Sequence, residues 1–344
     1  MLGATGEQLH TLYSIEAKEQ EEWKESSLEI TRDEWRNYLG RRDLQRSFFN
    51  FFEDELMRNQ YDWKKVCRKY LLEGKEPLVN SLVADAAHPL IHLGYAFELD
   101  SREIATEALT LAATCYKDLH KLIDGEHQHR MPSTVQLKFS LPEMISTLHN
   151  DHAFDHLLTR PGLDNLDIIM KERGNLVIQY FHRLKVEEID DESFDRMAAL
   201  MLVATHKPNE PQYDFFLCHV LTSLHAMRVL LADAASSIKL DLKRQFWLFM
   251  LLAYLTQMRP KVDESLVDET KLDGKGWDFI YEAALKGDHS TDVHDVKALR
   301  SLSVCEKRNP SSTFWLQAAV KFAMQKKQWT GFGYPGEPQL AVRV

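Results

Sequence analysis

Apolar residues recur at three- and four-residue steps along this chain, and that spacing limits the possible folds more than any other feature of the sequence. Between residues 93 and 115 the recurring positions are Leu93, Ala96, Phe97, Ile104, Ala108, Leu111, Ala112 and Cys115. This spacing places apolar side chains on one face of a helix. Period-two alternation, the pattern of a strand, is rare. We therefore predict an all-α protein in which residues 1–344 form a single large multi-helix domain with a buried central site.

Cap and turn signals indicate where some of these helices begin and end. Asp100-Ser101 is typical of a turn followed by an N-cap, and Thr31 to Glu34 has the form of a capping box. Residues 261–288 are charged and are predicted to be irregular. Further helical segments are expected over residues 1–75, 166–184, 193–204, 245–257 and 314–327.

Charge and cysteine usage exclude several classes of protein. The 42 basic and 52 acidic residues give a net charge of −10 without a basic block, which argues against nucleic acid or a membrane surface as a partner. The four cysteines are far apart, so a disulfide framework or zinc ribbon is not expected. The longest apolar run, residues 246–255, is too short to span a bilayer, and the first residues lack the pattern of a signal peptide. A cytoplasmic protein is expected.

A histidine pair stands out in the apolar stretch from His88 to Glu98. His88 and His92 are four residues apart, so on a helix both rings lie on one face. Pro89 suits the first turn of a helix, which places His88 near its start. Gly94 would allow another backbone or a ligand to approach closely. Two histidines in an apolar wall are either packed core residues or metal ligands, and the pair alone leaves both readings open.

Two later stretches carry the same kind of signal. His219 is enclosed by apolar residues of a predicted helix, and His294 and Lys297 are three residues apart on another. Neutral imidazoles suit iron, copper and zinc, so these helices predict one mononuclear site. The alternatives are independent core histidines, with Lys297 in a surface salt bridge.

Two other groups of histidines are weaker candidates for metal binding. His149, His152 and His156 share one helical stripe, but acidic residues surround them. His127 and His129 lie in a polar connection over residues 124–134.

Several enzyme signatures are missing from the sequence. It contains no P-loop motif, and its one Gly-x-Gly-x-x-Gly, at residues 331–336, lies in a Gly/Pro-rich tail that is not predicted to open a helix, so nothing local supports dinucleotide or nucleotide binding. His-Glu-x-x-His and Gly-x-Ser-x-Gly are also absent. Glu-x-x-His occurs at residues 7–10 and 126–129, but the second lies in a polar connection, so the pair of helical motifs of a di-iron bundle is not formed.

The chain resembles the questin oxidase-like proteins of fungi, which act on anthraquinones and related aromatic polyketides. The resemblance lies in the His88–Glu98 stretch, in Asp214-Phe-Phe-Leu-Cys-His219 with Thr222-Ser223, in His294-x-x-Lys297 with Leu299-Arg300, and in Leu2-Gly-Ala-Thr5. These motifs follow one another in the family's order and cover almost the entire chain. The family also has a helix with an Asn-His motif ahead of the Leu-Gly-Ala segment, and we expect this helix to be missing here.

The resemblance implies an all-helical oxygenase that uses O2 and a small aromatic substrate. One version is a non-haem Fe(II) enzyme that opens a quinone ring, and the other is an NADPH-dependent Baeyer–Villiger monooxygenase. In the iron version the implied ligands are His88, His92, His219, His294 and a carboxylated Lys297. The candidates for a pocket that accepts a flat polycyclic substrate are Tyr95, Phe215, Phe216 and Trp247. The iron oxygenase is the preferred prediction, and an inactive helical binding protein is the alternative from another class.

Overall fold

A computed structural model describes residues 2–342 except 21, 23, 27, 118, 120–138, 234–235, 311 and 339. Its α-helices are α1 (Gly6–Glu19), α2 (Gln45–Arg58), α3 (Trp63–Leu72), α4 (Ala84–Leu99), α5 (Arg102–Thr114), α6 (Leu141–Asn150), α7 (Asn165–Arg183), α8 (Asp191–Val203), α9 (Phe215–Asp233), α10 (Ser236–Thr256), α11 (Ser265–Asp268), α12 (Trp277–Lys286), α13 (Val293–Arg308) and α14 (Phe314–Gln325). The 3₁₀ helices are η1 (Trp35–Tyr38), η2 (Arg42–Leu44), η3 (Leu78–Ser81), η5 (His152–Phe154) and η6 (Val186–Glu188), and the strands are β1 (Tyr213–Asp214) and β2 (Trp329–Thr330). The predicted all-α fold is confirmed.

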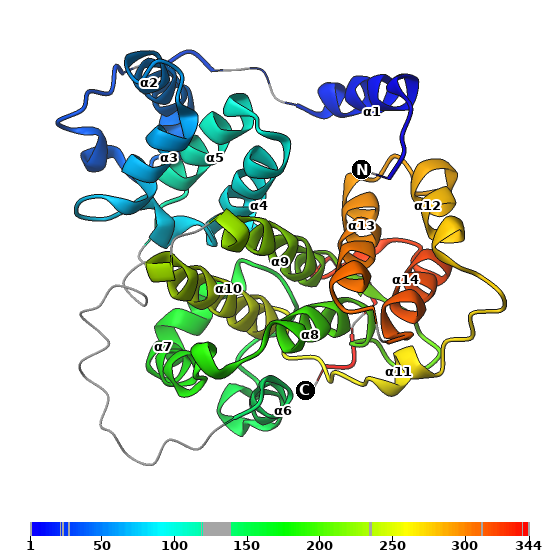
Figure 1. The fold of residues 1–344 in the computed structure, drawn as a ribbon. Coiled ribbons are helices and arrows are strands. Elements are labelled where there is room, and N and C mark those ends of the chain that lie inside the picture. The colour runs from blue at the N-terminus through cyan, green and yellow to red at the C-terminus, as the bar shows by residue number, and fades with distance from the viewer. Residues whose placement is uncertain are drawn as a thin grey trace.

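Helix α9 lies at the centre of the fold and contacts α4, α8, α10 and α13 (Figure 1). Its residues Phe215–Ala232 are apolar and long enough to cross a membrane, but 72% of this window is buried inside the fold. A helix that is apolar all round is expected wherever other helices surround it. The burial of α9 thus accounts for its composition.

A glycine sets the distance between α4 and α9. A Cβ added at Gly94 of α4 would lie 2.5 Å from the Cβ of Ala226 on α9 and 2.6 Å from its Cα. The two backbones therefore pack closer than any larger pair of residues would allow. The sequence-based expectation of a close approach at Gly94 is confirmed.

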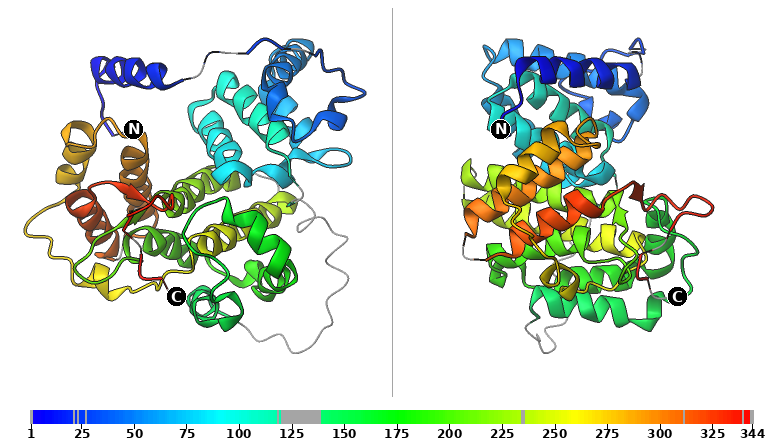
Figure 2. Two further views of the ribbon diagram at one scale, coloured as in Figure 1. Left: turned by 180° about the vertical axis from the view of Figure 1, so that it is seen from behind. Right: turned by 90° about the vertical axis from the view of Figure 1, so that its right-hand side faces the viewer.

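The first 75 residues are less helical than predicted. Helix α1 lies beside α12 and α13 and away from α2 and α3, as Figure 1 and the left view of Figure 2 show. Gln8 Nε2 donates to the carbonyl of Leu285 at 3.1 Å. Residues 28–34 form an irregular segment, and Thr31 begins a turn that leads into the short η1. The predicted capping box at Thr31 is wrong because no α-helix begins there; the box at α1 is formed instead by Thr5 and Gln8.

A buried carboxylate fastens the irregular segment to α2 and α3. Glu55 is fully buried and forms ion pairs with Arg32, with Arg58 at 3.1 Å and with Lys69 at 3.0 Å. Burial opposes ionisation of this side chain, but its cationic partners outweigh burial and lower the pKa of Glu55 to about 2. Without these cations the charge would be costly in the core.

The second half follows the prediction more closely, with two differences. Helices α7, α8 and α14 occupy the expected segments, and Ser101 caps α5 as predicted. Residues 261–288 are not wholly irregular, because α11 and α12 form there. Two short strands, β1 and β2, pair in parallel and join the start of α9 to the segment after α14. The predicted connection that contains His127 and His129 lies outside the described residues.

Candidate metal centre

Three histidines that are distant in the sequence meet where α4, α9 and α13 converge. One ring nitrogen from each of His88, His219 and His294 lies within 4.8 Å of the other two. The ring centres of His88 and His294 are each 5.1 Å from that of His219. These three residues, called the histidine trio below, were all among the candidate ligands named from the sequence.

A left-handed turn precedes the first histidine. Asp85, Ala86 and Ala87 have φ values of 53°, 54° and 62°, and this conformation costs roughly 1–2 kcal/mol for each residue that is not glycine. The turn brings the carbonyl of Asp85 to 2.6 Å from Nδ1 of His88, and Arg42 forms an ion pair with the Asp85 carboxylate. The strain therefore lies next to the site, where it orients a candidate ligand.

Backbone carbonyls fix the tautomers of two members of the trio. Nδ1 of His88 faces the carbonyl of Asp85, and Nδ1 of His219 faces the carbonyl of Phe215 at 2.8 Å. A carbonyl can only accept a hydrogen bond, so each Nδ1 carries the proton and each Nε2 keeps its lone pair. Burial lowers the pKa of His219 to about 3. The ring is neutral at physiological pH, which is the form that binds metals.

The third histidine is held at the start of α13. Asp292 caps this helix by accepting from the backbone N–H of His294 at 2.9 Å, and the same carboxylate oxygen lies 3.7 Å from His294 Nδ1. Its other oxygen accepts from Nζ of Lys326 at 3.1 Å and from Nε1 of Trp329 at 2.6 Å. Sequence reasoning missed Asp292 as a supporting residue, although an aspartate immediately before a predicted helix was a usable signal.

His92 and Lys297 lie beside the trio rather than in it. The ring centre of His92 is 6.4 Å from that of His88, and its Nδ1–H donates to the carbonyl of His88 at 3.0 Å. Burial lowers the pKa of Lys297. The charge of this lysine lowers the pKa of both His92 and His219, which indicates that its amine is near these rings.

Aromatic rings cover the trio on the side of α9 and the chain's tail. The Phe215 ring centre lies 4.5 Å from that of His294 and 4.8 Å from that of His219. Trp329 and Phe332 pack on Phe215 at 5.9 and 5.1 Å. These two residues were not found from the sequence, because they follow the last predicted helix and carry no spacing signal of their own.

The other predicted pocket residues are in three different environments. Phe216 packs on Phe332, next to the trio. Trp247 is fully buried, and its indole N–H donates to the carbonyl of Phe181 at 3.1 Å, so it belongs to the core. Tyr95 lines a cavity.

That cavity, called the α1 cavity below, has a volume of about 670 Å³ and lies between α1, α4, α12 and α13. Leu9 and Leu12 of α1 contribute to its apolar wall, and Tyr95 adds an aromatic ring. Lys297 also lines it, one helical turn after His294. A mostly apolar hollow of this size with a few polar groups is typical of a small-molecule site. The lysine connects the cavity to the metal candidate.

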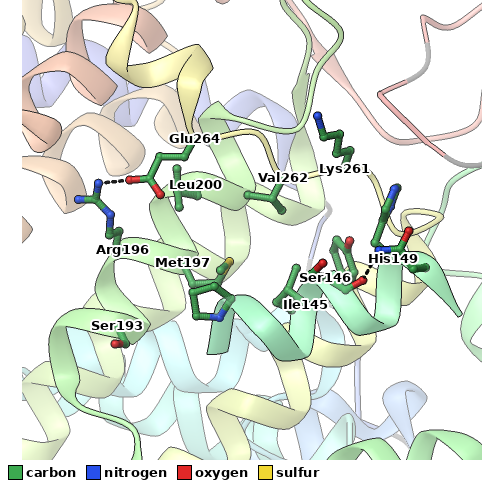
Figure 3. A pocket seen from close by; sticks show the side chains of 13 residues that line it. Ile145, Ser146, His149, Ser193, Arg196, Met197, Leu200, Lys261, Val262 and Glu264 are labelled. Atoms are coloured by element: carbon green, nitrogen blue, oxygen red, sulfur yellow. Dashed lines mark hydrogen bonds and ion pairs between the residues drawn. The ribbon is translucent and has the colours of Figure 1, made fainter. Parts of the chain in front are cut away.

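The histidines of the weaker candidate group do not share a stripe. His149 belongs to α6 and His152 to η5, and His156 has a φ of 57°, so no single helix carries them. His149 lines a hollow of about 440 Å³ between α6, α8 and residues 261–264, on whose wall Arg196 and Glu264 form an ion pair (Figure 3). No member of the histidine trio lines this hollow.

A buried acid caps the helix that carries His219. Asp214 is fully buried and accepts from the N–H groups of Phe216 at 2.8 Å and Leu217 at 2.9 Å. The amide of Gln257, oriented to satisfy its neighbours, donates to the second oxygen at 2.8 Å. Burial raises the pKa of Asp214 to about 7. A Cβ at Gly331 would clash with this carboxylate, so the tail passes closely over it.

Comparison with known proteins agrees with the motifs around the histidine trio. The family model of the questin oxidase-like proteins matches residues 1–302, a span that includes α4, α9 and the histidine and lysine of α13. The chain belongs to the questin oxidase-like family. The resemblance inferred from the sequence is confirmed.

Three proteins that are similar in sequence to this questin oxidase-like chain are named for Baeyer–Villiger oxidation. The Baeyer–Villiger monooxygenase dmxR6 of Cryptosporiopsis sp. (strain 8999) is 22% identical over 74% of this chain and 61% of its own length. The Baeyer–Villiger oxidase AgnL3 of Paecilomyces divaricatus is 24% identical over 77% and 61%. The Baeyer–Villiger oxidase GME11358 of Pestalotiopsis microspora is 25% identical over 88% and 72%. The chain thus spans about 61% of the length of the first two relatives.

Proposed function

We propose that this chain is an oxygenase that uses O2 to open a ring of an aromatic polyketide such as an anthraquinone, at a single non-haem iron. The observation that carries the proposal is the meeting of three imidazoles from three helices at one point. Family membership and the oxygenase names of the relatives support the reaction class. The ligand set implied by the resemblance supports the choice of iron.

The described residues fit a metal ion. Two nitrogens bound to one ion at about 2.1 Å lie roughly 3–4 Å apart, so nitrogens within 4.8 Å need only small side-chain rotations to share an ion. Nε2 of His88 and of His219 keeps a lone pair because Nδ1 donates to a carbonyl. An imidazole set suits iron among other transition metals.

Each side chain would have a distinct task. The histidine trio would hold the iron, with His92 as a further ligand on the same face of α4. Bound iron supplies the activation of O2, which does not react readily with a closed-shell aromatic ring unaided. The aromatic rings of Phe215 and its neighbours would shield His219 and His294 from water. The α1 cavity would hold the flat substrate against Tyr95.

Lys297 is proposed to complete the ligand set as a carbamate. Its neutral amine would add to CO2, forming an N–C bond and releasing one proton, so that a cation becomes an anionic oxygen ligand. An ammonium group would be repelled by a nearby metal, whereas a carbamate oxygen is attracted. The placement of Lys297 one turn after His294 supports this role.

Elemental analysis of the purified protein tests the proposal. About one iron per chain is expected in the wild type, and His219→Ala is expected to lose most of it. His152→Ala is the matched control, because the His152 side chain is 80% exposed and lies outside the trio. Turnover of an anthraquinone by protein that contains no transition metal would refute the iron mechanism.

A second candidate is an NADPH-dependent Baeyer–Villiger monooxygenase. The names of all three relatives favour the Baeyer–Villiger reaction. This reaction would consume NADPH and give a lactone, and a chelator would leave its rate unchanged. The one Gly-x-Gly-x-x-Gly, at residues 331–336, opens no helix among the described residues and so lacks the context of a dinucleotide site, which is the reason for placing this candidate second. Oxygen uptake measured with and without NADPH distinguishes the two mechanisms.

A further inference from the structure

One wall of the α1 cavity carries a guanidinium, which keeps its positive charge at any physiological pH. Lys297 and Arg300 are three residues apart on α13, and both line the cavity. The Arg300 side chain is only 10% exposed, so its guanidinium faces the cavity rather than bulk solvent. Glu7, on α1, is the one acidic side chain among the described residues that line the cavity.

A carboxylate behind this wall holds the guanidinium. Nη2 of Arg300 donates to Glu98 on α4, and Nε2 of His225 on α9 lies 3.2 Å from the other oxygen of the same carboxylate. Glu98 is not among the lining residues, whereas Arg300 is. Glu98 therefore holds the arginine from behind, and this contact uses only part of a group with five N–H donors.

The remaining surface of the cavity suits a flat, mostly apolar molecule. The centre of the Tyr95 ring lies 5.7 Å from the guanidinium carbon of Arg300, so a ring system that packs on Tyr95 also reaches the guanidinium. Leu9, Leu12 and Leu99 provide apolar contacts. An acidic oxygen at the edge of such a ring would accept charge-assisted hydrogen bonds from the N–H donors of a guanidinium whose side chain is 10% exposed.

We propose that Arg300 anchors the substrate and selects a polycyclic aromatic molecule that carries an ionised phenol or carboxylate, and that Glu98 positions Arg300 for this task. The inference rests on the proposed function, because it takes an aromatic polyketide as the occupant of the α1 cavity. It adds a specificity-determining residue that lies outside the set of metal ligands.

The test compares two probes that differ only in the acidic oxygen. The first is 1,3,8-trihydroxy-6-methylanthraquinone, whose 3-hydroxyl is not engaged by a quinone carbonyl, and the second is its 3-O-methyl ether. Dissociation constants are measured by calorimetry on the full chain as purified, under nitrogen to prevent turnover, at a pH at which the free phenol is ionised. The readout is the ratio of the two affinities, which a general loss of stability does not change.

Wild-type protein is expected to bind the phenol more tightly than the ether. Arg300→Gln is expected to reduce that preference roughly tenfold, the loss of one charge-assisted hydrogen bond, and Arg300→Lys to keep part of it. Glu98→Gln is expected to reduce the preference less than Arg300→Gln. The matched control is Arg308→Gln, which removes another α13 guanidinium whose partner is the buried Asp195 and which lies outside the cavity. This control is expected to keep the wild-type ratio.

The possible outcomes separate this inference from the proposed function. If Arg300→Gln keeps the wild-type preference, or loses affinity for both probes equally, the anchoring role alone is refuted. A protein that binds neither probe refutes the anchoring role together with the proposed substrate class. A preference that depends on Arg300 in protein without iron supports the anchor and refutes only the iron mechanism.

Discussion

Substitution of Gly94 by alanine tests how the histidine trio is assembled. The added Cβ would lie 2.5 Å from the Cβ of Ala226, whereas ordinary contacts begin at 3.4 Å, so α4 and α9 would have to separate by about 1 Å. Overpacking of this kind costs roughly 1–3 kcal/mol, partly offset by the higher helix propensity of alanine, about 1 kcal/mol. Because the clash also involves the Cα of Ala226 at 2.6 Å, the cost should lie in the upper part of that range, and we expect a net destabilisation of about 1–2 kcal/mol.

Thermal unfolding measures this effect. Unfolding entropy scales with chain length, so 1 kcal/mol shifts the Tm of a chain of 344 residues by about 1.4 °C, and a fall of roughly 2–3 °C is expected. Iron content should fall as well, because α4 carries His88 and α9 carries His219.

Gly174→Ala on α7 is the matched control for that experiment. A Cβ there would meet only the end of Met170, at 3.7 Å, so the variant should be as stable as the wild type or slightly more stable. Equal Tm values for the two variants, or wild-type iron content in Gly94→Ala, would show that the close helix crossing does not hold the site together.

Two buried acids give opposite dependences of stability on pH. The pKa of Glu55 is lowered to about 2 from an ordinary value of 4.5. Its ion pairs therefore stabilise the fold above pH 4.5, and this contribution is lost as the pH falls toward 2. Glu55→Gln should make the free energy of unfolding, measured with urea, less dependent on pH across that window. The pKa of Asp214 is raised to about 7, so the wild type should lose stability as the pH rises from about 4 to 7. If the free energy of unfolding of Asp214→Asn depends on pH as steeply as that of the wild type, this assignment is contradicted.

Much of the site could be predicted from the sequence because histidines are conspicuous in apolar helices. His88 and His219 each interrupt a run of apolar residues, where packing or ligation is the usual explanation, and His294 shares a predicted helix face with Lys297. The point where they meet depends on which helices pack together, and the spacing of residues in the sequence does not determine this packing. The resemblance to the questin oxidase-like family supplied that information.

The remaining parts of the site depend on backbone geometry. The left-handed turn over residues 85–87 contains two alanines, and no propensity argument predicts a positive φ for alanine. The prediction of His92 as a ligand relied on a shared helix face; its Nδ1–H donates to the carbonyl of His88, which leaves Nε2 with its lone pair, and its ligand role stays a prediction. Helix α12 was missed because the charged residues on its exposed face obscured its apolar positions.

The separation of the three histidines in the chain determines when the centre can form. More than half of the residues lie between His88 and His294, and Trp329, which fixes Asp292, follows later still. During synthesis on the ribosome, α4 and α9 emerge long before their partner on α13. An ion held by all three histidines would therefore be acquired only after residue 294 has been made, and the segment that contains α4 and α9 would remain metal-free until then.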